Sequence, residues 1–278
     1  MFGKTMSPWI TLPVSERLQS HFSTAQVRHH MEAEKVDAAW KATRHSLIHL
    51  FQESSRFEAI LTEAFVSVLT PLPYPDLNMA VLGRSSPDSR LLTHFLGTCR
   101  QKYTPSLCLV VGETPECHTA GLQPVGSIPL MQLRNQTTPI AASHIHCLPA
   151  ANDCNIREAN HVVAAAFDIP AEAIESAFGG NIPQHPGLRV YVAKQADSVV
   201  SSLRISRIGS TAVIWCMATS PDSQRQGIGP QLLQTAITSE RQTGADNFLW
   251  LATPAGMRLY EKLGFITLGE ASAFLLTT

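Results

Sequence analysis

The chain lacks the features of a membrane-embedded or exported protein. Over its 278 residues, no run approaches the roughly eighteen consecutive apolar residues that a membrane-spanning helix needs. Its first residues contain no apolar stretch of the kind found in secretory signal peptides, and its six cysteines form no Cys-x-x-Cys pair. Because scattered cysteines without an export signal favour free thiols in a reducing compartment, we expect a cytoplasmic protein without a membrane partner.

Charged residues of either sign are also scarce. They make up 15% of the chain, the formal net charge is −1, and no long basic stretch occurs. A nucleic-acid partner normally requires a basic patch that pairs with phosphates, so the sequence argues against one. The hydrophobic fraction of 44% is typical of a globular protein with a substantial core. The length fits one large domain or two of ordinary size.

A metal site has little support in the sequence. His144, His146 and Cys147 lie close together, and Cys154 follows downstream. Structural zinc requires four ligands in a closed tetrahedral arrangement, whereas the mixed polar composition around these residues is typical of a linker. We therefore expect no metal.

The most informative stretch follows an apolar run over residues 212–218. It reads Ser-Pro-Asp-Ser-Gln-Arg-Gln-Gly-Ile-Gly-Pro from Ser220 to Pro230, and apolar residues then recur at helical spacing. A strand, a glycine loop and a helix start in this order predict a phosphate-binding site, because the free N–H groups and the dipole of the helix favour an anion. Gly227 and Gly229 would let the backbone approach the phosphates. The Rossmann spacing and the Gly-Lys-Ser/Thr of a P-loop are both absent, but an ordinary strand-to-helix turn fits as well.

A second segment favours the phosphate site over the ordinary turn. Residues 248–252 have the composition of a buried strand, after which Thr253 is a suitable N-cap and Pro254 suits the first helical position. The string Leu-Tyr-Glu-Lys-Leu-Gly-Phe then ends at Phe265, and its glycine stands where a helix would end in a left-handed residue.

Together, the Gln-x-x-Gly-x-Gly loop and this closing string resemble the GNAT superfamily of N-acetyltransferases, over about residues 188–278. The resemblance implies an α/β fold with a mixed, mostly antiparallel twisted sheet flanked by helices. It also implies acetyl-CoA or another acyl-CoA as co-substrate, with the loop holding the pyrophosphate and the preceding strand exposing its backbone to pantetheine. The residues implied to bind CoA are Met217, Ala218, Thr219, Gln224, Arg225, Gln226, Gly227, Ile228, Gly229 and Pro230.

The same resemblance implies two catalytic groups. The backbone N–H of Met217 is the candidate donor to the oxyanion. Tyr260 is the candidate general acid, because a phenol with a pKa of about 10 remains protonated at neutral pH and can protonate a leaving thiolate. The alternative for both side chains is core packing.

No general base can be assigned from the sequence. The strand over residues 211–218 contains no carboxylate, and the amine could also arrive neutral and need no base. Carboxylates on the early helices of this half could act directly or through water; they are Asp168, Glu172 and Glu175.

The N-terminal half of the chain has a pattern of its own. Apolar periodicity predicts a long helix over residues 27–52 and a second helix over residues 57–69. Three prolines in residues 71–75 interrupt the pattern. The expected elements that follow are a strand over residues 78–82, a helix from Pro87, a strand over residues 106–111 and a strand that ends at Leu133.

This order recurs in the C-terminal half. Gly121 and Gly126 are followed 143 positions later by Gly264 and Gly269. A constant offset between similar orders of elements indicates a tandem repeat of one fold. We expect two tandem GNAT-like domains, a degenerate one over residues 1–139 and a catalytic one over residues 140–278.

The first copy lacks the residues that carry the chemistry. It has Arg84 and Ser86 near the positions of the two loop glycines, and Cys117 at the position of the tyrosine. A copy without a phosphate loop would be structural or would shape the acceptor pocket.

The leading hypothesis is an N-acyltransferase that moves an acetyl or other acyl group from CoA to the amine of a small molecule, by direct attack in a ternary complex. One alternative is the same fold with a tRNA- or carrier-bound acyl donor, and another is a non-catalytic CoA-binding module. The intact glycine loop favours CoA, the scarcity of basic residues disfavours tRNA, and Tyr260 favours catalysis. The acceptor and the choice between monomer and homodimer stay open.

Overall fold

The structure is a computed structural model. It describes residues 24–52, 54, 57–83, 89–112, 120–134, 145–179, 182 and 185–277. The chain forms two compact units, residues 1–39 and residues 40–278, and every strand belongs to the second. Five residues discussed above lie outside the described residues: Arg84, Ser86, Pro87, Cys117 and His144.

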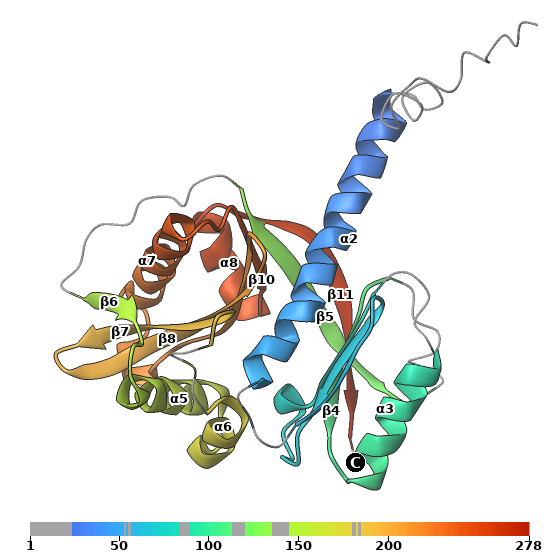
Figure 1. Ribbon diagram of the computed structural model, residues 1–278, viewed down its shortest axis with the longest axis horizontal. Helices are drawn as coiled ribbons and strands as arrows, with labels where there is room; N and C mark the ends of the chain where they lie inside the picture. Colours follow the sequence, from blue (N-terminus) through green and yellow to red (C-terminus); the bar gives the residue numbers. More distant parts are fainter. Residues whose placement is uncertain are drawn as a thin grey trace, which may run out of the picture. The chain divides into compact units, whose positions relative to one another are not determined.

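Figure 1 shows the elements in chain order. None of the helices within the described ranges is both long enough and apolar enough to cross a membrane. The elements are α2 (Thr24–Phe51), β1 (Glu58–Leu61), β2 (Phe65–Leu69), η1 (Pro75–Leu77), β3 (Met79–Leu82), α3 (Ser89–Gln101), β4 (Ser106–Val110), β5 (Gln123–Leu133), β6 (His146–Pro149), α5 (Asp153–Phe167), α6 (Ala171–Phe178), β7 (Leu188–Gln195), β8 (Ser198–Ile208), β9 (Thr211–Thr219), η3 (Pro221–Ser223), α7 (Ile228–Gln242), β10 (Asn247–Leu251), α8 (Pro254–Lys262) and β11 (Phe265–Leu276).

The helix expected over residues 57–69 is wrong. This segment is the hairpin of β1 and β2, in which Phe65 pairs with β3 and all five residues of β2 are buried. A strand that is buried throughout shows no alternation of apolar and polar residues, and its β-branched valines favour an extended backbone. The Thr62 hydroxyl closes the turn by accepting a hydrogen bond from the Phe65 N–H at 3.0 Å.

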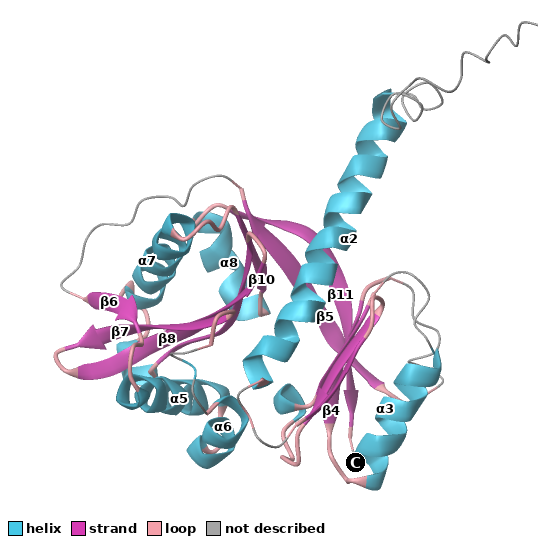
Figure 2. Ribbon diagram, viewed as in Figure 1, coloured by secondary structure: helices cyan, strands magenta, loops and turns pink. Residues whose placement is uncertain are grey.

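The strands form one mixed sheet that is mostly antiparallel, as predicted (Figure 2). Its order is β1-β2-β3-β4-β11-β5-β10-β9-β8-β7-β6, and the parallel pairs are β3 with β4 and β9 with β10. We expected each half to have its own sheet, but the two halves share a single eleven-stranded sheet.

Each half completes its sheet with a strand from the other half. The strand β5 of the first half lies between β10 and β11, and β11 of the second half lies between β4 and β5. Both strands are long, 11 and 12 residues, because each runs across the junction. The backbone groups of each exchanged strand are therefore satisfied by both halves.

The register of β5 with β11 is nearly symmetric. Gln123 pairs with Leu275 and Leu133 pairs with Phe265, so an offset of 142 residues maps one strand onto the other. The helix between each pair of parallel strands also corresponds, since α3 connects β3 to β4 and α7 connects β9 to β10. This correspondence supports the proposed tandem repeat, whose boundary at residues 139 and 140 lies outside the described residues.

In the second half, helices cover both faces of the sheet (Figure 2). The helices α7 and α8 bury their apolar side chains against β9 and β10 in one continuous core. The helix α5 packs on β8 and β9 from the opposite face. In the first half, α3 packs against β2, β3 and β4 in a separate core. The fork in the sheet described below therefore lies between two packed helical layers.

A buried carboxylate ties α7 to the edge of this sheet. Glu240 is fully buried, and its two carboxylate oxygens accept hydrogen bonds from Arg189 (2.8 and 3.0 Å) and Arg207 (2.9 Å). The Tyr191 hydroxyl donates to the same carboxylate at 2.8 Å. Two guanidinium groups and a hydroxyl thus replace the hydration that the Glu240 carboxylate loses when it is buried.

Removal of this carboxylate should destabilise the fold. We expect Glu240→Ala to lower the free energy of unfolding by about 3–5 kcal/mol, because it leaves Arg207 largely buried without a counter-charge. Glu63→Ala is the control, since it removes an exposed carboxylate that pairs with Lys41 at 3.1 Å. Urea denaturation of both variants tests the difference, and equal midpoints would contradict the assigned role of Glu240.

The strand exchange predicts that the second half will not fold alone. A fragment of residues 140–278 lacks β5, so β10 and β11 would each expose an unpaired edge, a feature that promotes aggregation. We expect the fragment to be insoluble, and co-expression with residues 1–139 to restore a soluble complex. A soluble, monomeric fragment with cooperative thermal unfolding would contradict this prediction.

Candidate active site

The two parallel strands of the second half separate into a fork. Pairing of β9 with β10 begins at Thr211 and Asn247 and ends at Ile214 and Trp250. The last residues of β9, from Trp215 to Thr219, pair with β8 alone. On the side facing β10, these residues have no strand partner.

A bulge in β9 marks the point of separation. Arg204 of β8 pairs with Trp215, and Ser202 pairs with Ala218, so Cys216 and Met217 together stand opposite one residue. Cys216 has a φ of 48°, in the left-handed region that non-glycine residues rarely adopt. Bulges increase the local twist and turn a strand away from its neighbour. The bulge thus accounts for the opening beside β10.

The glycine loop follows β9 directly and leads into α7. Gly227 is the N-cap of this helix and has a φ of 79°. The side chains of Gln224 and Gln226 donate to the carbonyls of Thr219 (3.1 Å) and Asp222 (3.0 Å), which closes the loop on itself. The N–H groups of the first helical turn have no partner within the helix and are left for an anion.

A close contact holds the start of α7 against the open end of β9. A Cβ atom on Gly229 would lie 2.7 Å from the terminal methyl of Met217 and 3.3 Å from the hydroxyl oxygen of Thr219. Only glycine fits here without displacing these side chains. The helix N-terminus and the fork are therefore parts of one site.

Tyr260 lies beside the fork. Its ring stacks on Trp250, the last residue of β10 that pairs with β9, with the ring centroids 3.9 Å apart. A Cβ atom on Gly256 would lie 2.8 Å from the Tyr260 hydroxyl, so the glycine makes room for it. The hydroxyl forms no hydrogen bond with the residues that the structure describes, and burial raises the pKa of Tyr260 above its ordinary value. The phenol is therefore protonated at neutral pH.

The bulge carries an unusual electrostatic environment. Burial raises the pKa of the Cys216 thiol, Arg204 lowers it, and Asp76 of the first half raises it. Arg204 is fully buried, donates to the Asn160 carboxamide oxygen and lies 4.8 Å from the Phe178 ring centroid. Within the described residues it has no carboxylate partner, and its Nε and one Nη remain without a hydrogen bond.

The three sequence-based candidates for the general base lie at the end of α5 and in α6. Asp168 caps the C-terminus of α5 in a left-handed conformation, Glu172 lies in the first turn of α6, and Glu175 pairs with His161 at 3.3 Å on the protein surface. The charges that act on the Cys216 thiol are those of Arg204 and Asp76. Sequence reasoning missed Asp76 because it follows a proline-rich stretch of the other half, far from any motif.

The first half shows no corresponding fork within its described residues. All four residues of β3, Met79–Leu82, pair with β4, and β3 ends where the pairing ends. The segment that corresponds to the glycine loop lies outside the described residues. The first half thus lacks the exposed strand end that the second half offers.

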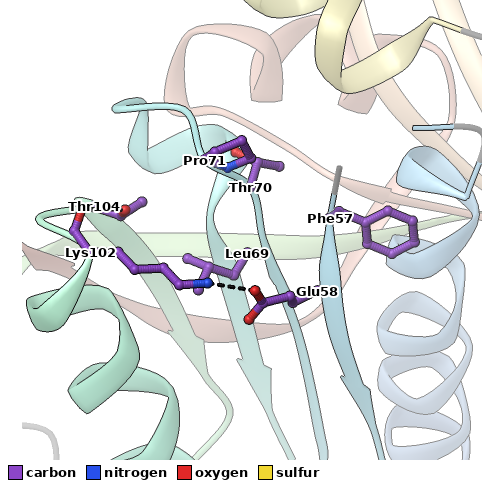
Figure 3. A pocket seen from close by; sticks show the side chains of 7 residues that line it. All are labelled: Phe57, Glu58, Leu69, Thr70, Pro71, Lys102 and Thr104. Atoms are coloured by element: carbon purple, nitrogen blue, oxygen red, sulfur yellow. Dashed lines mark hydrogen bonds and ion pairs between the residues drawn. The ribbon is translucent and has the colours of Figure 1, made fainter. Parts of the chain in front are cut away.

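A cavity of about 600 Å³ lies in the first half (Figure 3). Lys102 and Glu58 point toward one another across it and form an ion pair of 2.5 Å. The cavity lies near Leu69, which follows the pairing of Val68 with Met79 at the N-terminal end of β3. A phosphate loop would follow the C-terminal end of β3, so this cavity is not the counterpart of the fork.

No metal centre is present among the described residues, where no group of three His, Cys, Asp or Glu side chains could hold an ion. Cys147 is partly buried and Cys154 is exposed, and both are free thiols.

Comparison with known proteins identifies the domain around the fork. Residues 186–267 match the family model of the acetyltransferase (GNAT) domain. A GCN5-related N-acetyltransferase from Kribbella flavida shares 16% identity and a TM-score of 0.61, over 86% of this chain and 94% of that chain. A putative GNAT-family acetyltransferase from Novosphingobium aromaticivorans shares 14% identity and a TM-score of 0.56, over 85% and 97%. These identities show a common fold. No curated protein matches the sequence.

The single fork predicts a single acyl-CoA site. In calorimetric titration with acetyl-CoA, we expect about one site per chain, because among the described residues the second half alone presents a helix N-terminus at an open strand end. Gly229→Glu should abolish binding, since it places a carboxylate at that N-terminus. Gly97→Glu is the matched control, because Gly97 lies in α3 of the first half with open space at its Cβ position. Two equal sites, or loss of binding in the control alone, would contradict the assignment.

Proposed function

From the premise that the chain is a GNAT superfamily protein, we propose that it is an N-acyltransferase that moves an acetyl or other acyl group from CoA to the amine of a small molecule. The observation that carries the proposal is the fork between β9 and β10, with the N-terminus of α7 held against its open end. This arrangement supplies an anion site and a row of exposed backbone groups in the order that an acyl-CoA requires.

The donor fits the fork through backbone contacts. Met217, Ala218 and Thr219 would offer their backbone groups to pantetheine, because these residues have no partner on the β10 side. The loop from Gln224 to Pro230 would hold the pyrophosphate through its N–H groups and the helix dipole. Arg225, which is exposed and has a φ of 60°, would add a cation.

Two groups would act on the reacting thioester. The Met217 N–H would donate to the carbonyl oxygen as negative charge develops there, and the bulge fixes its direction. Tyr260 would protonate the departing sulfur, for which its protonated state at neutral pH is suited. A raised pKa also makes the phenol a weaker acid, so the proton transfer would depend on the negative charge that develops on sulfur as the C–S bond breaks.

The acceptor would be a small amine that reaches the fork from the side opposite the CoA loop. A direct attack in a ternary complex needs both substrates at the fork together. A tRNA- or carrier-bound donor remains the alternative, and so does a non-catalytic CoA-binding protein. Release of free thiol from acetyl-CoA, measured with and without a pool of amines, distinguishes catalysis from binding. A cytoplasmic location and a monomeric or homodimeric state remain parts of the proposal.

Tyr260 provides the test of the chemistry. We expect Tyr260→Phe to lower kcat by about 10²–10⁴-fold, because it removes the proton donor. The affinity for acetyl-CoA should stay unchanged, since the ring that stacks on Trp250 remains. Stability should also be retained, because the hydroxyl has no hydrogen-bond partner among the described residues.

Tyr191→Phe is the matched control for this substitution. It removes a hydroxyl that is bonded to Glu240, so it should lower stability and leave kcat of the folded protein near the wild-type value. Steady-state kinetics and thermal unfolding of both variants give the comparison. Wild-type turnover in Tyr260→Phe would mean that this tyrosine serves only packing.

A further inference from the structure

The fork lacks a carboxylate of its own. Neither β9, from Thr211 to Thr219, nor β10, from Asn247 to Leu251, contains an aspartate or glutamate. An alkyl amine is mostly protonated at neutral pH and cannot attack a thioester in that form. A base that accepts its proton would therefore have to come from another element.

The sheet places an element of the first half at the same end of the strands as the fork. Three successive antiparallel pairings separate β4 from β10, so these two strands run in opposite directions. The N-terminal ends of β3 and β4 consequently lie at the same end of the sheet as the C-terminal ends of β9 and β10. The short helix η1 directly precedes β3, and Figure 1 draws it in teal between β4 and α6.

A buried clamp fixes η1 at this edge. Asn78 is fully buried; its side chain accepts from the Thr70 N–H at 2.7 Å and donates to the carbonyls of Leu72 and Tyr74 at 2.7 and 2.9 Å. This clamp holds both ends of the proline-rich loop together. Asp76 is the acidic residue of η1 and lies within this fixed loop.

The Asp76 carboxylate is exposed to solvent and acts electrostatically on the bulge. The surrounding protein displaces enough water to raise the pKa of its carboxyl group. The charge of Asp76 acts on the Cys216 thiol, which neighbours Met217 in the bulge. Arg204 of β8 is the other charge that acts on this thiol. Asp76 is therefore a carboxylate of the first half that influences the strand end at the fork.

We propose that Asp76, contributed by the first half, is the general base that accepts the proton of the acceptor ammonium at the fork of the second half. This inference rests on the proposed acyl transfer. It gives the first half, which has no fork, a direct part in the reaction.

The step balances as follows. Asp76 accepts one proton from the ammonium, and the freed lone pair of nitrogen forms the C–N bond. The C–S bond breaks, its electron pair leaves on sulfur, and the sulfur takes a proton from Tyr260. The phenolate regains a proton from the nitrogen of the new amide, and Asp76 returns its own to water.

Kinetics of an Asp76 variant test the proposal. The acceptor for this test is an alkylamine that has been identified by the release of free thiol from acetyl-CoA. With it, Asp76→Asn should lower kcat by about 10²–10⁴-fold at an unchanged affinity for acetyl-CoA. Asp76→Glu should recover part of the loss. With the β-trifluorinated analogue of the same acceptor, whose amine is largely neutral at neutral pH, Asp76→Asn should approach the wild-type rate. A purely structural role would lower the rates for both acceptors alike and would overturn the proposal.

The control is a second carboxylate of the first half. Glu58→Gln removes an exposed charge that pairs with Lys102 and does not act on Cys216, so turnover should be unaffected. Wild-type kcat in Asp76→Asn with the unfluorinated acceptor overturns the inference while leaving the acyl transfer intact.

A readout without turnover separates this inference from the proposed function. Because the Asp76 charge disfavours the Cys216 thiolate, Asp76→Asn should speed alkylation of Cys216 by iodoacetamide, measured by peptide mass spectrometry. Acetyl-CoA should slow this alkylation. An unchanged rate in Asp76→Asn would overturn the placement of Asp76. Absence of thiol release with every amine, despite protection by acetyl-CoA, would instead overturn the proposed acyl transfer.

Discussion

The exchange of β5 and β11 between the two halves is the constraint on which the rest of the structure depends. Each of these strands has backbone N–H and C=O groups that pair with both halves, and an unpaired edge at either place would be costly and prone to association. The two halves therefore cannot vary their relative direction without breaking a ladder. This fixed relation brings η1 of the first half to the edge at which the fork of the second half opens.

The sequence predicted local structure well where a single physical signal dominates. The glycine loop, the N-cap at Thr253 and the proline at the start of α8 are short-range features, and the structure contains each of them. The Thr253 hydroxyl accepts from the Gly256 N–H at 3.3 Å, as expected of an N-cap. The segment over residues 57–69 was predicted wrongly, because β2 is buried throughout and has no period of two for the sequence to reveal.

Long-range features could not be predicted from the sequence. The constant offset between the halves indicates a repeat, but two separate sheets and one sheet with exchanged strands would give the same offset. The bulge at Cys216 depends on the register between β8 and β9, which no local pattern specifies. The position of Asp76 depends on both the exchange and the Asn78 clamp. Local motifs could therefore suggest residues for a donor site, whereas a contribution from the other half of the chain could not be foreseen.

The two halves differ at the feature that decides their chemistry. In the first half, all four residues of β3 pair with β4, and within the described residues no strand end is left open. In the second half, β9 continues past the pairing, and the buried Arg204 lies beside the resulting bulge on the α5 and α6 side. The exchanged strands place the N-terminal ends of β3 and β4 at the end of the sheet where this fork opens, so the sheet itself joins the first half to the fork of the second half.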